Sequence, residues 1–150
     1  MANSYTELHY HCVFSTKDRR MLITPEIEDR IWAIIAKTAS THEMNAQRVG
    51  GIENHVHILL NIPKNIALAD AMKRLKGGCS KAINQAGLTK GYFGWQDGYS
   101  AFTVSTSAIT DVMTYITNQR KHHQKHTFEE EYVALLEKHG VDFDPQYLWG

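Results

Sequence analysis

The residues best suited to chemistry are two histidines, His55 and His57, which flank a single valine. They belong to the run 53–62, which alternates as a strand does, with an apolar face at 56, 58, 60 and 62 and the histidines on the other face. Alternate strand side chains project in parallel roughly 7 Å apart, so both imidazoles can converge on one ion. Imidazole suits several divalent ions, and a third ligand must come from elsewhere. The pattern predicts part of a metal site on the non-core side of a strand.

A second group of polar residues lies late in the chain, in a stretch with helical periodicity. Tyr115 and Gln119 are four residues apart and project together from a helix, with His122 and His126 on the same stripe. Gln119 offers an amide oxygen, a hard ligand that suits Mg²⁺ or Mn²⁺ better than Zn²⁺. Tyrosine can act as a covalent nucleophile, and a metal-bound phosphodiester would expose its phosphorus to that phenol. The residues fit one reaction, phosphoryl transfer beside a metal ion.

Cations that could contact a nucleic-acid backbone form local groups only. The formal net charge is zero, so any such contact must come from a patch and not from a global field. A single-stranded or hairpin backbone suits cations together with aromatic residues such as Trp95. Lysines on a helix also fit an ordinary solvated face. The basic candidates are Arg19, Arg20, Lys73, Lys76 and Lys81.

The elements that must position these residues follow from hydrophobic periodicity. Strands and helices alternate as β-α-β-β-α-β, over residues 6–15, 24–42, 44–49, 53–62, 66–85 and 100–105. Thr24 is the expected N-cap of the first helix, with Pro25 at its first position. This order predicts an α+β, ferredoxin-like (RRM-like) antiparallel sheet with both helices on one face. The histidines would then lie on the open face.

Two glycine pairs interrupt these patterns. Gly50-Gly51 is expected to form a turn or bulge that closes the second strand. Gly77-Gly78 is expected to weaken or bend the second helix.

The C-terminal third adds helices to this fold. One is expected to start at Ser107 or Thr110, and a capping box at 127–130 opens the last, which ends near Gly140. The tail remains apolar to its end, so we expect the region from about 127 to 150 to dock on the body or on a second subunit.

Composition limits the broad class. A chain of 150 residues, 43% hydrophobic and 21% charged, fits one globular domain over 1–150. Two isolated cysteines make neither a disulfide framework nor a zinc knuckle and favour a reducing compartment. The sequence carries no evident signal peptide or membrane-length apolar run. We expect a cytoplasmic protein.

The motifs resemble those of the HUH endonucleases. His55-Val56-His57 is similar to their His-hydrophobic-His motif, and the run 115–119 (YITNQ) is similar to the tyrosine motif of the single-tyrosine transposases that mobilise small bacterial insertion sequences. The resemblance spans nearly the whole chain and includes the segments 14–20, 95–99 and 122–123. The pairing of both motifs on so short a chain is specific.

This resemblance implies an activity and a set of roles. The enzyme would cut single-stranded DNA at transposon ends, with Tyr115 attacking the scissile phosphate to form a 5′-phosphotyrosine. His55, His57 and Gln119 would hold Mg²⁺ or Mn²⁺, with no small-molecule cofactor. Hairpins near the DNA ends would be bound, the protein would be a homodimer, and the tyrosine helix could complete the site in cis or in trans. Backbone contacts would come from Arg19, Lys73, Lys76 and Lys81.

Three alternatives remain open at this point. The chain could be a non-catalytic binding module for single-stranded nucleic acid, although its sheet carries histidines where an RNA-recognition sheet needs aromatics. It could be a zinc hydrolase that adds His122 or His126 to the histidine pair. It could also be a domesticated family member that acts on dispersed palindromic repeats.

Overall fold

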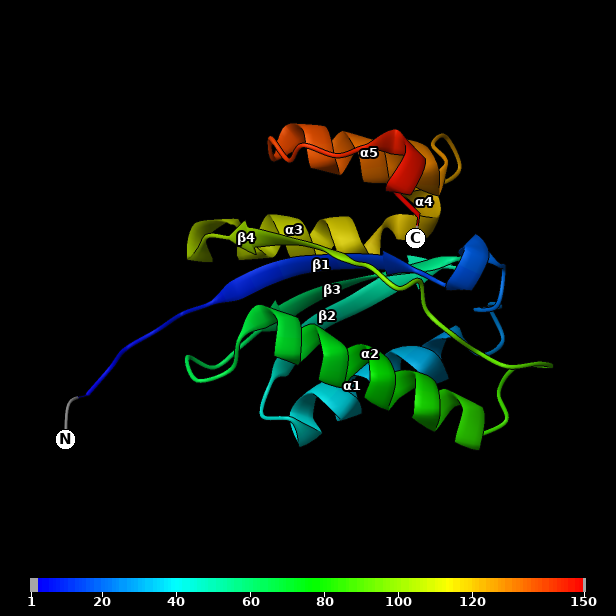
Figure 1. Ribbon diagram of the computed structural model, residues 1–150, viewed down its shortest axis with the longest axis horizontal. Helices are drawn as coiled ribbons and strands as arrows, with labels where there is room; N and C mark the ends of the chain where they lie inside the picture. Colours follow the sequence, from blue (N-terminus) through cyan, green and yellow to red (C-terminus); the bar gives the residue numbers. More distant parts are fainter. Residues whose placement is uncertain (1–2, 150) are drawn as a thin grey trace.

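A four-stranded antiparallel sheet forms the centre of the molecule (Figure 1). The computed structural model describes residues 3–149. The strands are β1 (His9–Ser15), β2 (Asn45–Ile52), β3 (His55–Asn61) and β4 (Ser100–Val104), in the spatial order β2-β3-β1-β4. The long helices α1 (Glu28–Thr41) and α2 (Leu68–Gln85) lie together on one face (Figure 1). The predicted ferredoxin-like order is therefore confirmed.

The main core lies between the sheet and these two helices. Cys12, Phe14 and Ile58 point into it and are fully buried, as their alternation with polar residues predicts. From the helices, Ile35 and Leu75 fill the same core.

The opposite face of the sheet is covered, which corrects the expectation of an open face. The helices α3 (Ile109–Thr117), α4 (Gln119–His122) and α5 (Phe128–Lys138) lie over it (Figure 1). A second, smaller apolar cluster packs beneath α5 and comprises Val13, Phe102, Phe128, Tyr132 and Leu136. The periodicity of the strands could not reveal this cover, because its helices follow the last strand and pack back onto the sheet.

The C-terminal tail contributes to the second cluster. Phe143, Leu148 and Trp149 pack against it, and a short 3₁₀ turn, Pro145–Tyr147, lies within the tail. Trp149 also receives the Arg19 guanidinium at 4.4 Å from the ring centre. This packing lies within one chain, on the body of the molecule.

One glycine of each pair, Gly50 and Gly78, marks the close approach of a helix, and Gly50-Gly51 does not form the predicted turn or bulge. Gly50 and Gly51 lie inside β2, where a Cβ on Gly50 would meet the Ile116 carbonyl oxygen of α3 at 2.5 Å. The strand irregularity lies earlier, between Ala46 and Arg48. The α2 helix continues through Gly78, whose Cβ would meet the α1 residue Thr38 at 2.7 Å.

The predicted helix boundaries need smaller corrections. Thr24 accepts backbone bonds from Ile27 and Glu28 through its carbonyl oxygen, and α1 begins at Glu28 after a turn that contains Pro25. A 3₁₀ turn, Thr106–Ala108, precedes α3, and the capping box between Thr127 and Glu130 opens α5 as predicted. Among residues 3–149, no helix combines the length and the apolarity needed to span a membrane.

Candidate active site

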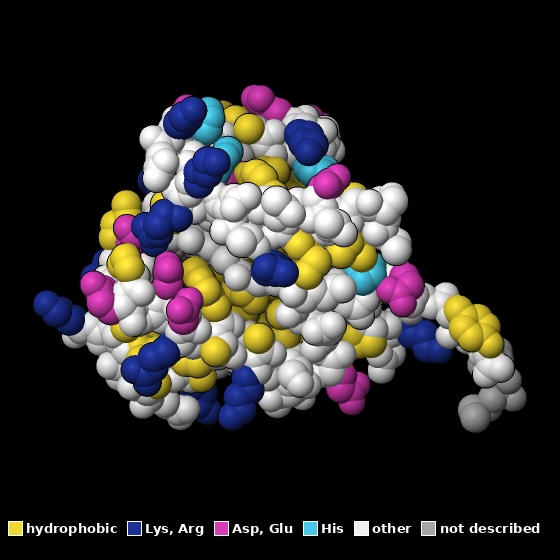
Figure 2. Space-filling view, turned by 180° about the vertical axis from the view of Figure 1, so that it is seen from behind, with side chains coloured by type: hydrophobic (Ala, Val, Ile, Leu, Met, Phe, Trp, Pro, Cys, Tyr) yellow, Lys and Arg dark blue, Asp and Glu magenta, His cyan; other side chains and the backbone are white. Residues whose placement is uncertain are grey.

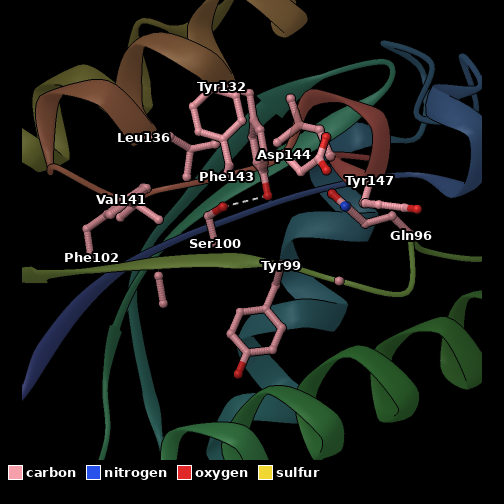
Figure 3. A pocket seen from close by; sticks show the side chains of 13 residues that line it. Gln96, Tyr99, Ser100, Phe102, Tyr132, Leu136, Val141, Phe143, Asp144 and Tyr147 are labelled. Carbon is pink, nitrogen blue, oxygen red and sulfur yellow. Dashed lines mark hydrogen bonds between the residues drawn. The ribbon is translucent and has the colours of Figure 1, made fainter. Parts of the chain in front are cut away.

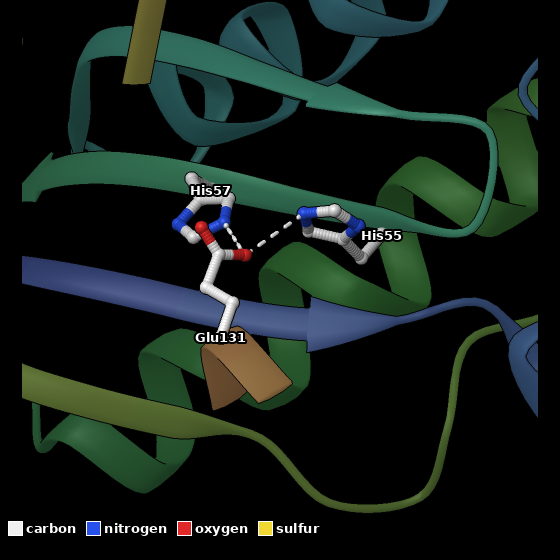
Figure 4. A group of neighbouring side chains, drawn as sticks. All are labelled: His55, His57 and Glu131. Atoms are coloured by element: carbon white, nitrogen blue, oxygen red, sulfur yellow. Dashed lines mark hydrogen bonds and ion pairs between the residues drawn. The ribbon is translucent and has the colours of Figure 1, made fainter. Parts of the chain in front are cut away.

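The candidate site lies between β3 and α5. His55 and His57 project from the covered face of the sheet, and both are fully buried. Glu131, in the N-terminal half of α5, points from that helix toward both rings (Figure 4). Its Oε1 lies 2.9 Å from His57 Nε2 and 3.3 Å from His55 Nε2. One ligand atom from each of these three residues lies within 4.8 Å of the others, so together they form a possible metal site.

The predicted tyrosine and glutamine reach the same place. Gln119 Oε1 lies 2.9 Å from His55 Nε2, and Gln119 Nε2 donates to Glu131 Oε2 at 2.9 Å. The Tyr115 hydroxyl donates to the same Oε2. All four residues predicted from the sequence therefore meet within one chain, gathered around a carboxylate that was not predicted.

Two further side chains fix the orientation of the imidazoles. His55 Nδ1 donates to Asn54 Oδ1 at 2.9 Å, and His57 Nδ1 lies 2.8 Å from His11 Nε2. Burial among these rings lowers the pKa of His11 to about 3, with the nearby His57 adding to the effect, so His11 is neutral and its Nε2 can accept a hydrogen bond from His57 Nδ1–H. Partners of this kind leave each Nε2 free to ligate a metal.

The donor set fits a divalent cation. The two ring nitrogens of His55 face only acceptors, Asn54 Oδ1 on one side and the oxygens of Gln119 and Glu131 on the other. Burial lowers the pKa of His55 to about 4, so its ring carries one proton and cannot satisfy both sides. A cation would satisfy the unprotonated side, and adjacent ligand atoms around Mg²⁺ lie about 3 Å apart, close to the spacing found here.

The charge of Glu131 is stabilised despite burial. Desolvation opposes ionisation, but the nearby His57 and hydrogen bonds with His123, His55 and His57 outweigh it and hold the pKa of this carboxyl well below its usual range. Burial, followed by the charge of Glu131, raises the pKa of the Tyr115 phenol. The phenol is therefore protonated, with its proton directed at the carboxylate.

Two other histidines, His122 and His123, contact the carboxylate. His123 Nε2 lies 3.1 Å from Glu131 Oε1 and 2.9 Å from Gln119 Oε1. Burial disfavours the charged ring, but the bond and charge of Glu131 outweigh this and raise the pKa of His123. His122 Nε2 lies 3.5 Å from Glu131 Oε2, and its ring stacks on His126 with centres 5.0 Å apart.

The four basic residues that the family resemblance implies as DNA contacts lie away from the histidine pair. Arg19 pairs with Glu129 at 3.3 Å. The Lys76 ammonium donates to three carbonyl oxygens of the 96–98 loop at 2.7 to 3.0 Å, so it is committed to holding that loop. Lys73 and Lys81 are exposed on α2, on the far side of the sheet from Tyr115. Trp95 is buried in the main core against Phe14, where it cannot stack on a base.

A polar hollow of about 400 Å³ adjoins Tyr115 instead. Two lysines (Lys121 and Lys125) and two histidines (His122 and His126) line this hollow, together with the amides Asn118 and Gln124. In Figure 2 Lys, Arg and His side chains gather at the upper left, the end of the molecule at which α4 lies.

Another hollow, of about 460 Å³, lies between β4 and the C-terminal segment. Ser100 donates to the Tyr132 hydroxyl across its floor, and Phe143 and Tyr147 line the side formed by the tail (Figure 3). It is separate from the histidine pair.

Sequence reasoning missed Glu131 and His11. His11 alternates with the core residue Cys12 along β1, so it lies on the histidine side of the sheet, and the register that sets Val13 opposite His57 brings it beside the pair. Glu131 carried a weaker signal, because the capping box fixes where α5 starts but not onto which surface it packs.

Comparisons with known proteins identify a family for this chain. The family model described as "Transposase IS200 like" matches residues 4–119. The chain is similar to the ISDra2 transposase TnpA of Deinococcus radiodurans, at 26% identity over 118 residues that cover 75% of this chain and 84% of that protein.

Two solved structures are also similar. A crystal structure assigned to a transposase from Deinococcus radiodurans aligns with a TM-score of 0.63 at 26% identity, covering 79% of this chain and 96% of that one. A REP-associated tyrosine transposase bound to a REP hairpin aligns with a TM-score of 0.59 at 13% identity, covering 82% of this chain and 73% of that one. The second likeness concerns the fold.

Proposed function

Because the chain belongs to the IS200-like transposase family, we propose that it cuts and rejoins single-stranded DNA at insertion-sequence ends with Tyr115 as the nucleophile. Transposases are DNA-processing enzymes, and the family resemblance inferred from the two motifs is confirmed. The observation that carries the proposal is the meeting of the Tyr115 phenol with the His55 and His57 cluster around Glu131.

The reaction transfers the scissile phosphate from one oxygen to another. The phenol oxygen of Tyr115 attacks the scissile phosphorus and loses its proton, while the bond from phosphorus to the 3′ oxygen breaks. The products are a 5′-phosphotyrosine and a strand with a free 3′-hydroxyl, whose oxygen takes up a proton. Attack on the phosphotyrosine by the 3′-hydroxyl of a second strand then releases Tyr115 and joins new ends. The number of phosphodiester-type bonds is conserved, so no external energy source is needed.

The histidine pair serves this reaction by holding a divalent ion. We propose Mg²⁺ or Mn²⁺ on His55 and His57, with Gln119 beside them. When bound, the ion neutralises charge on the phosphate. His11 and Asn54 keep the imidazoles in the orientation that ligation needs, and α3 holds the phenol over the pair.

The DNA strand reaches Tyr115 through the polar hollow beside it. Lys121 and Lys125 are exposed at its rim, and His126 adds a third group that can bind phosphate. Cations of this kind follow a nucleic-acid backbone without reading its sequence. Lys73 and Lys81 remain candidates for contacts to a hairpin stem that lies away from the reacting phosphate.

Hairpin recognition and dimer formation are further parts of the proposal. Both come from the family resemblance. Light scattering of the purified protein tests the dimer. Binding of hairpin against unstructured oligonucleotides tests the recognition element. A domesticated role on dispersed palindromes would leave the chemistry unchanged and alter only which hairpin binds.

The proposal is tested by incubating the protein with single-stranded DNA that carries a hairpin, in the presence of Mn²⁺. We expect a protein–DNA band that survives denaturation. Tyr115→Phe removes one oxygen and should abolish the band while hairpin binding persists. Tyr92→Phe is the matched control, because Tyr92 is 76% exposed and its neighbour Phe93 packs in the main core on the opposite face of the sheet. Cleavage by Tyr115→Phe at the wild-type rate would refute the assigned nucleophile and would favour a hydrolase or another group.

A second function has one observation in its favour. Two histidines and a glutamate also form the metal site of several zinc hydrolases, and His55, His57 and Glu131 make such a set. A hydrolase transfers the phosphate to water and leaves no covalent protein–DNA product. Metal analysis of protein purified without chelator, together with the denaturing gel, separates the two functions.

A further inference from the structure

Tyr115 lies between two hollows of different character. Toward α4 it borders the polar hollow, and among the described residues that line that hollow none is acidic. Toward β4 it borders a further hollow of about 450 Å³, which lies between β4, α3 and the C-terminal end of α5. This aromatic hollow is lined by Tyr115 together with His11, Phe102, Asp111, Lys138 and His139, among others.

We propose that the aromatic hollow binds one nucleobase of the substrate strand, next to the scissile phosphate, and that His139 and Asp111 hold this base. The inference rests on the proposed function and deepens it, because it names a specificity site for the strand that Tyr115 attacks. The protein itself would then read part of the sequence at the cleavage position.

A continuous row of rings leads from the nucleophile into this hollow. The rings of Tyr115 and His11 meet edge to face with centres 5.9 Å apart, and His11 meets Phe102 in the same way at 6.4 Å. The His139 ring stacks on Phe102, with centres 4.2 Å apart and planes 12° from parallel. Phe102 covers one face of that ring, whereas His139 as a whole is exposed. The other face of the His139 ring is therefore a platform on which a base can stack.

The charges of the aromatic hollow favour a base over a phosphate. Asp111 is exposed in the first turn of α3, and its carboxylate repels a phosphate but accepts hydrogen bonds from the amino or ring N–H groups of a base. Partial burial, with the nearby charge of Lys138, lowers the pKa of His139. The ring is therefore neutral near pH 7 and offers a π face in place of a charge. Lys138 is left to contact the phosphate that joins this nucleotide to its neighbour.

A single strand that presents a phosphate to the phenol fits both hollows at once. Its backbone runs through the polar hollow, where Lys121 and Lys125 are exposed, and the next nucleotide enters the aromatic hollow beyond Tyr115. A volume of about 450 Å³ lies in the range of sites that take small ligands. Proteins read unpaired bases in this way, by stacking on a ring and by hydrogen bonds to the edge of the base.

The test uses hairpin-bearing single-stranded DNA and Mn²⁺, after the cleaved bond has been mapped. Nucleotides within two positions of that bond are replaced one at a time by abasic residues, and single-turnover cleavage rates are measured. At one position the abasic residue should slow cleavage by the wild type by about tenfold, as expected for the loss of one stacked base. His139→Ala should slow cleavage of the intact strand by a similar factor. In that variant the same abasic residue should cost less than about threefold, because the ring and the base act on each other.

A conservative variant separates stacking from a structural role of the side chain. His139→Phe keeps a ring and should restore cleavage of the intact strand together with its dependence on the base. A loss in His139→Phe as large as in His139→Ala would overturn the proposal. So would wild-type cleavage by His139→Ala, or an equal loss on the intact and the abasic strands, which would indicate a backbone contact or a fault in folding.

Asp111→Asn tests the hydrogen bonds to the base. The change turns a carboxylate, which only accepts, into an amide that also donates. It should therefore alter the order of preference among the four bases at that position and leave cleavage of the abasic strand unchanged. Asp70→Asn is the matched control, because Asp70 is an exposed aspartate in the first turn of α2, on the other face of the sheet (Figure 1). An order of preference that Asp111→Asn leaves unchanged would overturn the role given to Asp111.

Base binding is also measurable without cleavage. In Tyr115→Phe, 2-aminopurine placed in turn along the strand should lose fluorescence at one position on binding, and the added change His139→Ala should prevent this loss. If this quenching occurs and the wild type forms no covalent DNA product, the base site stands and the transposase chemistry fails. If the covalent product forms on Tyr115 and no position shows quenching that depends on His139, the chemistry stands and the base site is overturned.

Discussion

The two faces of the sheet are built on different principles, although the same strands supply both. On one face, Cys12, Phe14 and Ile58 pack against α1 and α2 in a wholly apolar core. On the other, His57 and its neighbours meet α3 to α5 through hydrogen bonds around one carboxylate, with apolar packing only at the side. Adjacent residues such as His57 and Ile58 therefore lie on opposite faces of the sheet, one in the hydrogen-bonded cluster and the other in the apolar core.

This difference separates stability from chemistry. The apolar face gains its free energy from burial, which is non-directional, whereas the histidine face depends on a few directed hydrogen bonds and ion pairs. Substitutions on the first face should change the free energy of unfolding. Those on the second should change metal binding and catalysis.

The largest contrast is expected between His57→Ala and Ile58→Ala. His57→Ala should lower metal-dependent cleavage by at least about 10³-fold, because it removes part of a group that acts as a unit. Ile58→Ala should leave Mn²⁺ affinity nearly unchanged and lower the free energy of unfolding by about 2–5 kcal/mol, because it opens a cavity in a close-packed core. Urea titration and calorimetry on both variants measure this contrast. A large loss of Mn²⁺ affinity in Ile58→Ala would contradict it.

Adding metal should affect one face and not the other. At Mn²⁺ concentrations 100-fold above the dissociation constant, the folded protein should gain about 2.7 kcal/mol of stability by linkage. His57→Ala should gain almost nothing, while Ile58→Ala should gain as much as the wild type. Thermal melts with and without chelator give the comparison. A similar gain in His57→Ala would place the metal elsewhere.

Substituting Gly50 and Gly77 compares a glycine that a helix packs against with one that faces open space. Gly50→Ala forces a methyl against the Ile116 carbonyl oxygen, so it should destabilise the protein by about 1–3 kcal/mol and displace α3. Gly77→Ala meets no atom within 4 Å, and should stabilise α2 by up to about 1 kcal/mol. Denaturant midpoints of the two variants should move in opposite directions. A stabilising Gly50→Ala would show that α3 does not lie against β2.

The smallest effects concern DNA affinity. Lys121→Ala and Lys125→Ala should each weaken binding of single-stranded DNA by about 1 kcal/mol and lower the slope of log affinity against log salt by about 1 unit. Lys73→Ala and Lys81→Ala should change binding of an unstructured oligonucleotide by less. Fluorescence anisotropy over a salt series resolves these differences. The reverse ranking would place the reacting strand on the α2 side.

The sequence predicts the apolar face well and the histidine face in part. Alternation along residues 53–62 placed Ile58 on one side and His55 and His57 on the other, because a strand imposes a period of two. The four-residue spacing of Tyr115 and Gln119 predicted that they project together, and both meet Glu131.

The rest depended on long-range packing that no local pattern encodes. Glu131 lies 74 positions after His57, and nothing in the periodicity of α5 selects the surface on which it docks. Lys76 was a candidate DNA contact because it is a lysine on a helix, yet its ammonium donates to backbone carbonyls of a loop about 20 residues later in the chain. The Gly50-Gly51 pair suggested a turn. The structure instead requires glycine at position 50 because α3, which follows by more than 50 residues, packs against the backbone there.

The account is tested most directly by mapping the covalent bond. Wild-type protein is incubated with hairpin-bearing single-stranded DNA and Mn²⁺, digested with protease and nuclease, and examined by mass spectrometry for a nucleotide-modified peptide. We predict a 5′-phosphate-linked nucleotide on Tyr115 that is absent when Mn²⁺ is replaced by chelator. Efficient strand cleavage without any adduct, or an adduct on another tyrosine such as Tyr132, would contradict the account.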